Sequence, residues 1–292
     1  MKHLAAALVI VVTLAVIGCS PEYAEDADGA GFSAPTEMTR RMNDHVRETL
    51  QLDDQGDFEQ ARRGLIASAP HLQIKDADGA VIWDMPSFNF IEGPAPASVN
   101  PSLWRQAQLN AHHHGLFEVA DGLWQARGYD LANITFIKGE KGWIIFDPLT
   151  AKETAAAALK FINEQLGERP VTAVVYSHSH ADHFGGVRGV VDEADVRSGK
   201  VPVIAPVGFM DHAVSENVYA GNAMTRRLFY QYGVLLPRSP FGHVDQSIGK
   251  NTAAGNLGLI PPTVIVEDDF EEMTVDGVKM VFQNTPGTEA PA

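Results

Sequence analysis

A short stretch near the middle of the chain, Ser177 to Gly186, reads SHSHADHFGG and concentrates side chains that bind metal ions. Histidines two residues apart emerge on the same side of an extended backbone, so His178 and His180 can reach one ion. Asp182 and His183 follow closely and can face a second ion. Imidazole and carboxylate ligands suit zinc, and also iron or manganese, so the pattern predicts a metal site without fixing the metal. The alternative is a polar surface loop whose histidines make ordinary hydrogen bonds.

A pair of metal ions at this stretch would favour hydrolysis. Two ions sharing a water lower its pKa from about 15.7 towards 7, which supplies hydroxide at neutral pH without a separate general base. Asp147 precedes Pro148 at the end of another apolar run. Such an aspartate either orients a metal-bound histidine or initiates a turn, and the residues alone leave both interpretations open.

The elements around this stretch predict an α/β fold. Residues 171–176 form a nearly continuous apolar run, as expected of a strand buried on both faces, so the histidines follow the carboxyl end of an inner strand. Thr150 to Glu153 has the pattern of a capping box that opens an Ala-rich helix, which Gly167 closes. The remaining predicted elements are a hairpin of strands 133–137 and 143–146, a strand at 201–205, a helical stretch at 216–232, a hairpin of strands 272–275 and 278–282 about Asp276-Gly277, helices at 36–52 and 58–67, and an extended segment at 80–102.

The amino terminus has the features of an export signal. Met1-Lys2-His3 is slightly basic, and residues 4–17 are apolar apart from Thr13. This run is shorter than the roughly 20 residues of a transmembrane helix, so we predict a signal peptide at residues 1–18. Residues 16–19 resemble the bacterial lipoprotein box, which predicts lipidation of Cys19 and a membrane-anchored or periplasmic protein. A plain secretory signal is the alternative.

Changes in amino-acid composition and pattern divide the rest of the chain into a tether, an N-terminal extension and a main domain. Residues 19–35 are rich in Ala, Asp, Glu and Gly and predict a flexible tether. Residues 36–115 form a predicted helical and extended N-terminal extension, in which Met38 and Met42 begin an apolar stripe along the helix at 36–52. Residues 116–292 form the predicted main domain, where strands and helices alternate.

Charge and cysteine content exclude some functions. The 292 residues carry a net charge of −15 and contain no basic run that would bind phosphate backbones, so we expect no nucleic-acid partner. Cys19 is the single cysteine, so a disulfide within the chain is excluded. Any metal must therefore be held by histidines and carboxylates.

Several blocks of the sequence resemble one enzyme family. Residues 178–183 match the H-x-H-x-D-H signature of the metallo-β-lactamase superfamily, whose members include lactamases, thioesterases, phosphodiesterases and lactonases. The surrounding blocks resemble, within that superfamily, the linear alkyl sulfatases, which are alkyl/aryl-sulfatases of type III. These blocks are residues 57–67, 100–105, 114–119, 125–130, 146–150 and 284–291.

The resemblance implies a fold, a cofactor and a reaction. The fold would be the αββα sandwich with a binuclear site at one edge, and the reaction the hydrolysis of an alkyl sulfate ester to an alcohol and sulfate. By the resemblance, His178 and His180 would bind one of two zinc ions, and Asp182 and His183 the other. Glu289 falls where a further carboxylate ligand of the first zinc is expected.

Other residues are candidates for substrate contacts. Gln246, Lys250 and Asn251 are donors in a polar loop and candidates for binding the sulfate, although such residues also occur in ordinary surface loops. Aromatic and methionine side chains between residues 209 and 230 are candidates for a channel around the alkyl tail, or else simple core. These are Phe209, Met210, Tyr219, Met224, Phe229 and Tyr230.

The same resemblance places further functional parts after residue 292. A bridging glutamate, another histidine ligand, sulfate-binding arginines, a dimerisation domain and a domain resembling sterol-carrier proteins would all follow, so we expect an N-terminal fragment whose full-length form is a homodimer. Two alternatives compete with the alkyl sulfatase. One is another hydrolase of the superfamily, a phosphodiesterase or thioesterase, and the other is a catalytically inactive metal-binding module.

Overall fold

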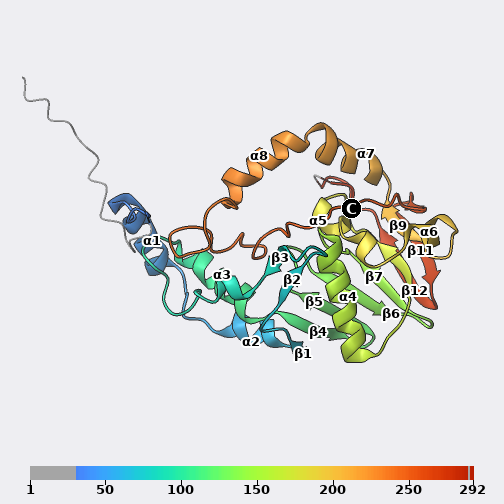
Figure 1. Cartoon of the computed structure of the whole chain (residues 1–292), viewed down its shortest axis with the longest axis horizontal. Helices are drawn as coiled ribbons and strands as arrows, with labels where there is room; N and C mark the ends of the chain where they lie inside the picture. The colour runs from blue at the N-terminus through green and yellow to red at the C-terminus, as the bar shows by residue number, and fades with distance from the viewer. Residues whose placement is uncertain (1–30, 289) are drawn as a thin grey trace, which may run out of the picture.

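A mixed β-sheet organises the protein, as seen in a computed structural model that describes residues 31–288 and 290–292 (Figure 1). Within these residues the sheet has eight strands in the order β1-β4-β5-β6-β7-β8-β9-β10. Neighbours from β1 to β7 are antiparallel, whereas β7, β8, β9 and β10 are parallel. The strands are β1 (Leu65–Ser68), β4 (Gly115–Ala120), β5 (Leu123–Arg127), β6 (Ile134–Lys138), β7 (Trp143–Phe146), β8 (Val171–Val175), β9 (Val203–Pro206) and β10 (Val264–Val266).

The parallel half of the sheet confirms the predicted inner strand. β8 lies between β7 and β9, and Ala173, Val174 and Val175 are fully or almost fully buried. Its carboxyl end therefore meets those of β7 and β9 at one edge of the sheet. The predicted hairpin of residues 133–137 and 143–146 is confirmed as the antiparallel pair β6 and β7.

One face of the sheet is covered by helix α4 (Lys152–Leu166), which packs its alanines and Ile162 into the main core. Gly167 ends this helix with a φ of 97°, as predicted. The predicted capping box is wrong, because Ala151 is the N-cap residue and makes no side-chain cap. The Thr150 hydroxyl donates to Asp130 instead, and Glu153 accepts from Asn256, so tertiary partners take the place of the local cap.

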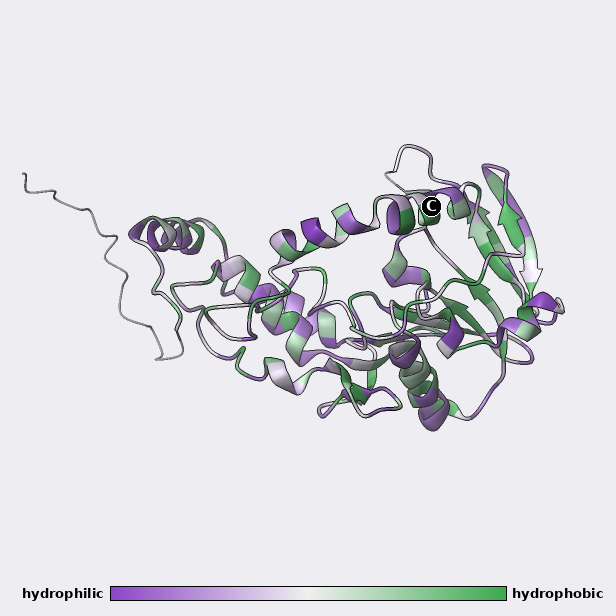
Figure 2. Ribbon diagram, turned by 45° about the horizontal axis from the view of Figure 1, so that its top comes forward, coloured by the Kyte–Doolittle hydropathy of each residue, from purple (hydrophilic) through white to green (hydrophobic). Residues whose placement is uncertain are grey.

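The other face of the sheet is covered by the antiparallel hairpin of β11 (Phe270–Val275) and β12 (Val278–Gln283). Asp276 and Gly277 have φ angles of 44° and 79°, which confirms the predicted tight turn. A second core lies between hairpin and sheet and includes Ile144, Val175 and Met280. Figure 2 shows the hydrophobic residues concentrated in these strands. The helix, sheet and hairpin layers confirm the α/β fold class.

Several short helices follow β8. The last three helices, α7, η3 and α8, form an arm that arches over the sheet edge (Figure 1). The predicted helical stretch 216–232 is confirmed, although its first part is a π-helical turn rather than an α-helix. The elements are α5 (Ala181–Phe184), η2 (Val187–Gly189), α6 (Glu193–Arg197), α7 (Phe209–Val214), η3 (Ser215–Tyr219) and α8 (Gly221–Tyr232).

The predicted N-terminal extension joins the sheet. The expected helix at 58–67 is partly wrong, because α2 ends at Arg62 and the next residues form β1, which pairs with β4. The helix at 36–52 is confirmed as α1, but Met38 and Met42 are 60% and 58% exposed, so the apolar stripe is not its packed face. The elements are α1 (Glu37–Thr49), α2 (Gly56–Arg62), β2 (Gln73–Lys75), β3 (Val81–Asp84), η1 (Pro86–Phe88) and α3 (Pro101–His112).

The predicted signal peptide, most of the predicted tether and Cys19 lie outside the described residues. Among the residues that the structure does describe, no helix is both long and apolar enough to cross a membrane.

Candidate metal centre

The four predicted ligands lie together at the carboxyl end of β8. Ser177 to Ser179 form a bend after the strand, His180 is extended, and Asp182 and His183 lie on the single-turn helix α5. The two glycines that follow let α5 approach the end of β7 closely. A Cβ on Gly186 would lie 2.2 Å from the carbonyl oxygen of Pro148, so glycine is required by packing at this position.

The predicted ligands form two close pairs. His178 Nε2 lies 3.1 Å from His180 Nδ1, and His183 Nε2 lies 3.2 Å from Asp182 Oδ2. The pairs adjoin, because the rings of His178 and His183 have centroids 4.0 Å apart. All four side chains are half-buried. These are the two pairs that the resemblance assigns to separate ions, and the assignment stays a prediction.

Asp147 lies behind the ligands and connects them to β7. Its Oδ2 accepts hydrogen bonds from His183 Nδ1 at 2.9 Å and from the Ser177 hydroxyl at 2.7 Å, and its Oδ1 accepts from the Ser177 backbone N–H. The proton on Nδ1 leaves His183 Nε2 facing the centre. Both interpretations of Asp147 therefore fit the structure, because its side chain contacts His183 and its backbone carbonyl accepts from Leu149 N–H in the turn after β7.

Ser177 contacts both Asp147 and His178, and the sequence analysis did not single it out. Since its hydroxyl donates to Asp147, it is available to accept from His178 Nδ1, which lies 2.9 Å away. That arrangement directs His178 Nε2 away from the serine and towards His180. The only sequence signal was its position as the first residue after the buried strand.

The histidines and carboxylates of the centre shift one another's pKa values. Burial lowers the pKa of His183, but hydrogen bonds and charges from Asp147 and Asp182 outweigh it and raise that pKa to about 10. Burial and the neighbouring His183 and His180 lower the pKa of His178. Burial raises the pKa of Asp182, whereas His183 lowers it, and the net shift is downward. These shifts favour a neutral imidazole at His178, a protonated imidazolium at His183 and a charged carboxylate at Asp182.

The donor chemistry fits metal ions that prefer nitrogen and oxygen ligands. Among the described residues, no group of three or more His, Cys, Asp and Glu side chains is arranged to hold an ion by itself, and Glu289 lies outside them. The arm adds an acidic neighbour that the sequence did not single out, since Glu216 Oε1 lies 3.9 Å from His180 Nε2. Among the residues that the structure describes, neither ligand pair is therefore a complete site, and Glu216 is a further acidic side chain near His180.

A cavity of about 600 Å³ opens beside His180 and Asp182, beneath α8. Of the predicted tail-binding residues, Met224 lines it, whereas Phe209 is buried in the core and Tyr230 is 92% exposed. Arg227 is a basic residue at its wall. Apolar lining residues that sequence reasoning missed are Leu131, Leu228, Ile248 and Leu257.

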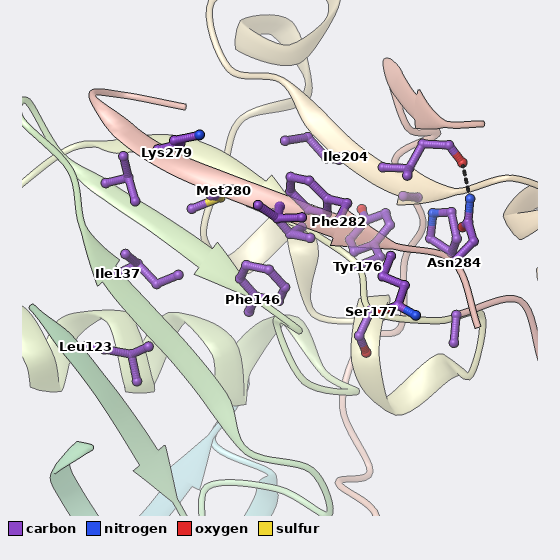
Figure 3. Close-up of a pocket in the computed structure, with 18 of the residues that line it drawn as sticks. Leu123, Ile137, Phe146, Tyr176, Ser177, Ile204, Lys279, Met280, Phe282 and Asn284 are labelled. Carbon is purple, nitrogen blue, oxygen red and sulfur yellow. Dashed lines mark hydrogen bonds between the residues drawn. The ribbon is translucent and has the colours of Figure 1, made fainter. Parts of the chain in front are cut away.

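A second cavity, of about 500 Å³, lies between the β11–β12 hairpin and the sheet (Figure 3). Its walls are apolar and include Ile137, Phe146 and Met280, with Ser177 at one end. None of the four predicted ligands lines this cavity. The cavity beneath α8, rather than this one, therefore borders the predicted ligands.

The predicted sulfate-binding residues have other partners in the structure. Lys250 is 2% exposed, and its ammonium lies 3.0 Å from Asp245 Oδ2 and donates to the Ala107 carbonyl. Gln246 is buried and donates to Asn251 Oδ1. None of the three predicted side chains lines the cavity beneath α8, to which the same loop contributes Ile248 and Thr252.

Comparison with known proteins decides the family. A model described as "Metallo-beta-lactamase superfamily" matches residues 127–288, which is more than half of the chain. The chain belongs to the metallo-beta-lactamase superfamily. The superfamily match covers β6 to β12 and the entire His178–His183 signature, which confirms the predicted resemblance.

Within the metallo-beta-lactamase superfamily, alkylsulfatases resemble this chain. It is 51% identical over 255 residues to an alkyl/aryl-sulfatase of Saccharomyces cerevisiae, covering 87% of this chain and 39% of that protein. It is 50% identical over 271 residues to an (R)-specific secondary-alkylsulfatase of Pseudomonas sp., covering 92% and 40%. A solved structure of a stereoselective inverting sec-alkylsulfatase from Pseudomonas sp. is 51% identical, with a TM-score of 0.83 over 88% of this chain and 40% of that one. The chain spans about two fifths of the length of these relatives.

Proposed function

We propose that this chain belongs to a zinc-dependent enzyme that hydrolyses alkyl sulfate esters to alcohol and inorganic sulfate. The observation that supports this most strongly is about 50% identity to alkylsulfatases over nearly the whole chain. The paired ligands and the apolar cavity beside them are consistent with an anionic head group attached to an alkyl tail.

In this proposal His178, His180, Asp182 and His183, together with Glu289, hold two zinc ions. The ions would supply Lewis-acid activation of water and positive charge that offsets the sulfate against a protein of net charge −15. Asp147 and Ser177 orient the imidazoles through the hydrogen bonds described above. Leu228 and Met224 bury the alkyl tail, which excludes water from one side of the ester.

We further propose that water attacks the carbon of the ester. One relative is named as an inverting sec-alkylsulfatase, and inversion of a stereocentre requires that its C–O bond break. The new C–O bond then forms from water, which releases one proton to the solvent, while the old C–O bond breaks and sulfate leaves with its four oxygens. Hydrolysis in water enriched in oxygen-18 should place the label in the alcohol. Label in the sulfate would overturn this step.

Substrate class is tested by assaying the full-length protein on dodecyl sulfate, a phosphodiester and a thioester. We expect turnover of the sulfate only, its loss in a chelator, and its recovery with zinc. His178→Ala should lose activity, whereas His71→Ala, at an exposed position in the extension, should retain it. Turnover of the phosphodiester or thioester in place of the sulfate would refute the proposal in favour of another hydrolase of the superfamily.

We also propose export with lipidation at Cys19, on the basis of the amino-terminal sequence. Expressed in a bacterium, the protein should fractionate with membranes, and Cys19→Ala should fractionate with soluble periplasmic proteins. Equal distribution of the two forms would refute lipidation.

A further inference from the structure

Asp130 is a buried carboxylate outside the candidate ligand set. It lies three residues beyond the end of β5 and is 2% exposed. Burial raises the pKa of Asp130, and hydrogen bonds that its two oxygens accept from several neutral donors oppose that rise in part. The donors are Leu131 N at 2.8 Å, Thr150 N at 3.1 Å, Thr150 Oγ1 at 3.0 Å, Ala151 N at 3.3 Å, Thr154 Oγ1 at 2.7 Å and Ala253 N at 3.0 Å.

These donors come from three segments that surround the cavity beneath α8. Leu131 and Thr150 line that cavity themselves, and Thr252 beside Ala253 lines it as well. Asp130 therefore joins three walls of the cavity at one point. Leu131 is adjacent to Asp130, whereas the donors in the Thr150 and Ala253 segments lie 20 to 123 residues away in sequence.

The segment held most tightly by Asp130 follows a strained turn. Asp147 and Leu149 have φ angles of 54° and 60°, a left-handed conformation that is unfavourable for residues with a side chain. Such a turn persists only where the surrounding structure holds it. Gly186 N–H donates to the Leu149 carbonyl on one side, and Asp130 holds Thr150 on the other.

The turn determines where the Asp147 carboxylate points. Its left-handed backbone leaves the Asp147 side chain directed at His183 Nδ1 and Ser177, at 2.9 Å and 2.7 Å. A relaxed turn would withdraw this acceptor from both ligand-bearing residues. The position of Thr150 is thus coupled to the orientation of His183 through three intervening residues.

We propose that Asp130 is a positioning residue of the metal centre, which anchors Thr150 and Ala151 and so holds the Asp147 turn against His183. The proposal rests on the proposed function, because it requires a metal at that centre. Partners that orient metal ligands typically change metal affinity by about 10- to 100-fold when they are removed. We expect a change of that size although Asp130 touches none of the ligands.

The test measures the zinc affinity of the metal-free full-length protein by competition with a chromophoric chelator. Asp130→Asn preserves shape but points an amide N–H₂ at donors, and we expect about 10- to 100-fold weaker zinc binding. Asp276→Asn is the matched control. Asp276 also joins three segments, through Lys141 N, Gly142 N and the Thr172 hydroxyl, but it does so at the opposite end of β8. It should lose folding stability without losing zinc affinity.

The outcomes separate this proposal from the proposed function. If the parent chain binds zinc and Asp130→Asn binds it equally well, the positioning role is overturned and the metal centre stands. If the parent full-length protein binds no zinc, both are overturned. Should Asp130→Asn fail to fold by circular dichroism, Thr154→Val removes one donor to Asp130 and Thr154→Ser restores it. Weaker zinc binding in the valine variant with recovery in the serine variant supports the role, and equal affinities overturn it.

Discussion

Replacing Lys250 with methionine should unfold this protein at much lower denaturant, because Lys250 forms an interior ion pair. The side chains of Lys250 and Asp245 are 1% and 0% exposed, and their charged atoms lie 3.0 Å apart. Lys250 Nζ also donates to the Ala107 carbonyl at 2.7 Å, and Asp245 accepts from Asn110. The pair joins α3 to the loop that leads into the cavity beneath α8.

The expected magnitude follows from this geometry. Two unit charges 3.0 Å apart attract by about 5.5 kcal/mol at an effective dielectric constant of about 20. Desolvation of both ions offsets much of that attraction, but Lys250→Met leaves Asp245 buried and unpaired. Breaking a buried pair in this way costs about 3–5 kcal/mol, which is a large part of the roughly 5–15 kcal/mol that stabilises a typical domain.

Urea unfolding monitored by tryptophan fluorescence measures this cost. Lys200→Met is the matched control, because its partner Asp195 lies 2.8 Å away in an exposed pair, which contributes about 0–1 kcal/mol. The double variant Lys250→Met with Asp245→Asn should recover part of the loss, since no charge remains buried. A loss below about 1 kcal/mol for Lys250→Met would refute the structural role and favour the substrate-binding role predicted from sequence.

Three further outcomes are expected. Burial, with Arg238 and Lys250 nearby, lowers the pKa of His243 to about 4. The unfolded chain therefore takes up this proton near pH 6.5 and the folded one only near 4, so stability should fall over that window as pH falls, by up to about 3 kcal/mol. His243→Gln should lose less stability than the parent between pH 7 and 4.5 in urea titrations. Gly186→Ala should lower the melting temperature, since its Cβ would lie 2.2 Å from a backbone oxygen and relief of such crowding costs about 1–3 kcal/mol; an unchanged melting temperature would contradict the packing described here. Asp147→Asn should weaken zinc binding by about 10- to 100-fold in a chelator competition, because it removes a charged acceptor from His183; unaltered affinity would exclude the orienting role.

Local patterns in the sequence determined much of the framework. Apolar runs and the alternation of apolar and polar residues are properties of neighbouring positions, which the sequence shows directly. The inner strand, both hairpins and the Asp276-Gly277 turn were therefore predicted and found. The spacing of His178, His180, Asp182 and His183 also depends only on adjacent positions, and it brought the four side chains together as expected.

Tertiary structure alone decided the contacts between distant segments. Thr150 looked like a helix cap because the local pattern matched, but its hydroxyl is used by Asp130, 20 residues earlier. Lys250 looked like a free donor, but a buried carboxylate and a carbonyl 143 residues away take its ammonium. A polar side chain that leaves water must find a partner wherever the fold supplies one, and that partner is set by how the chain packs rather than by its neighbours in sequence.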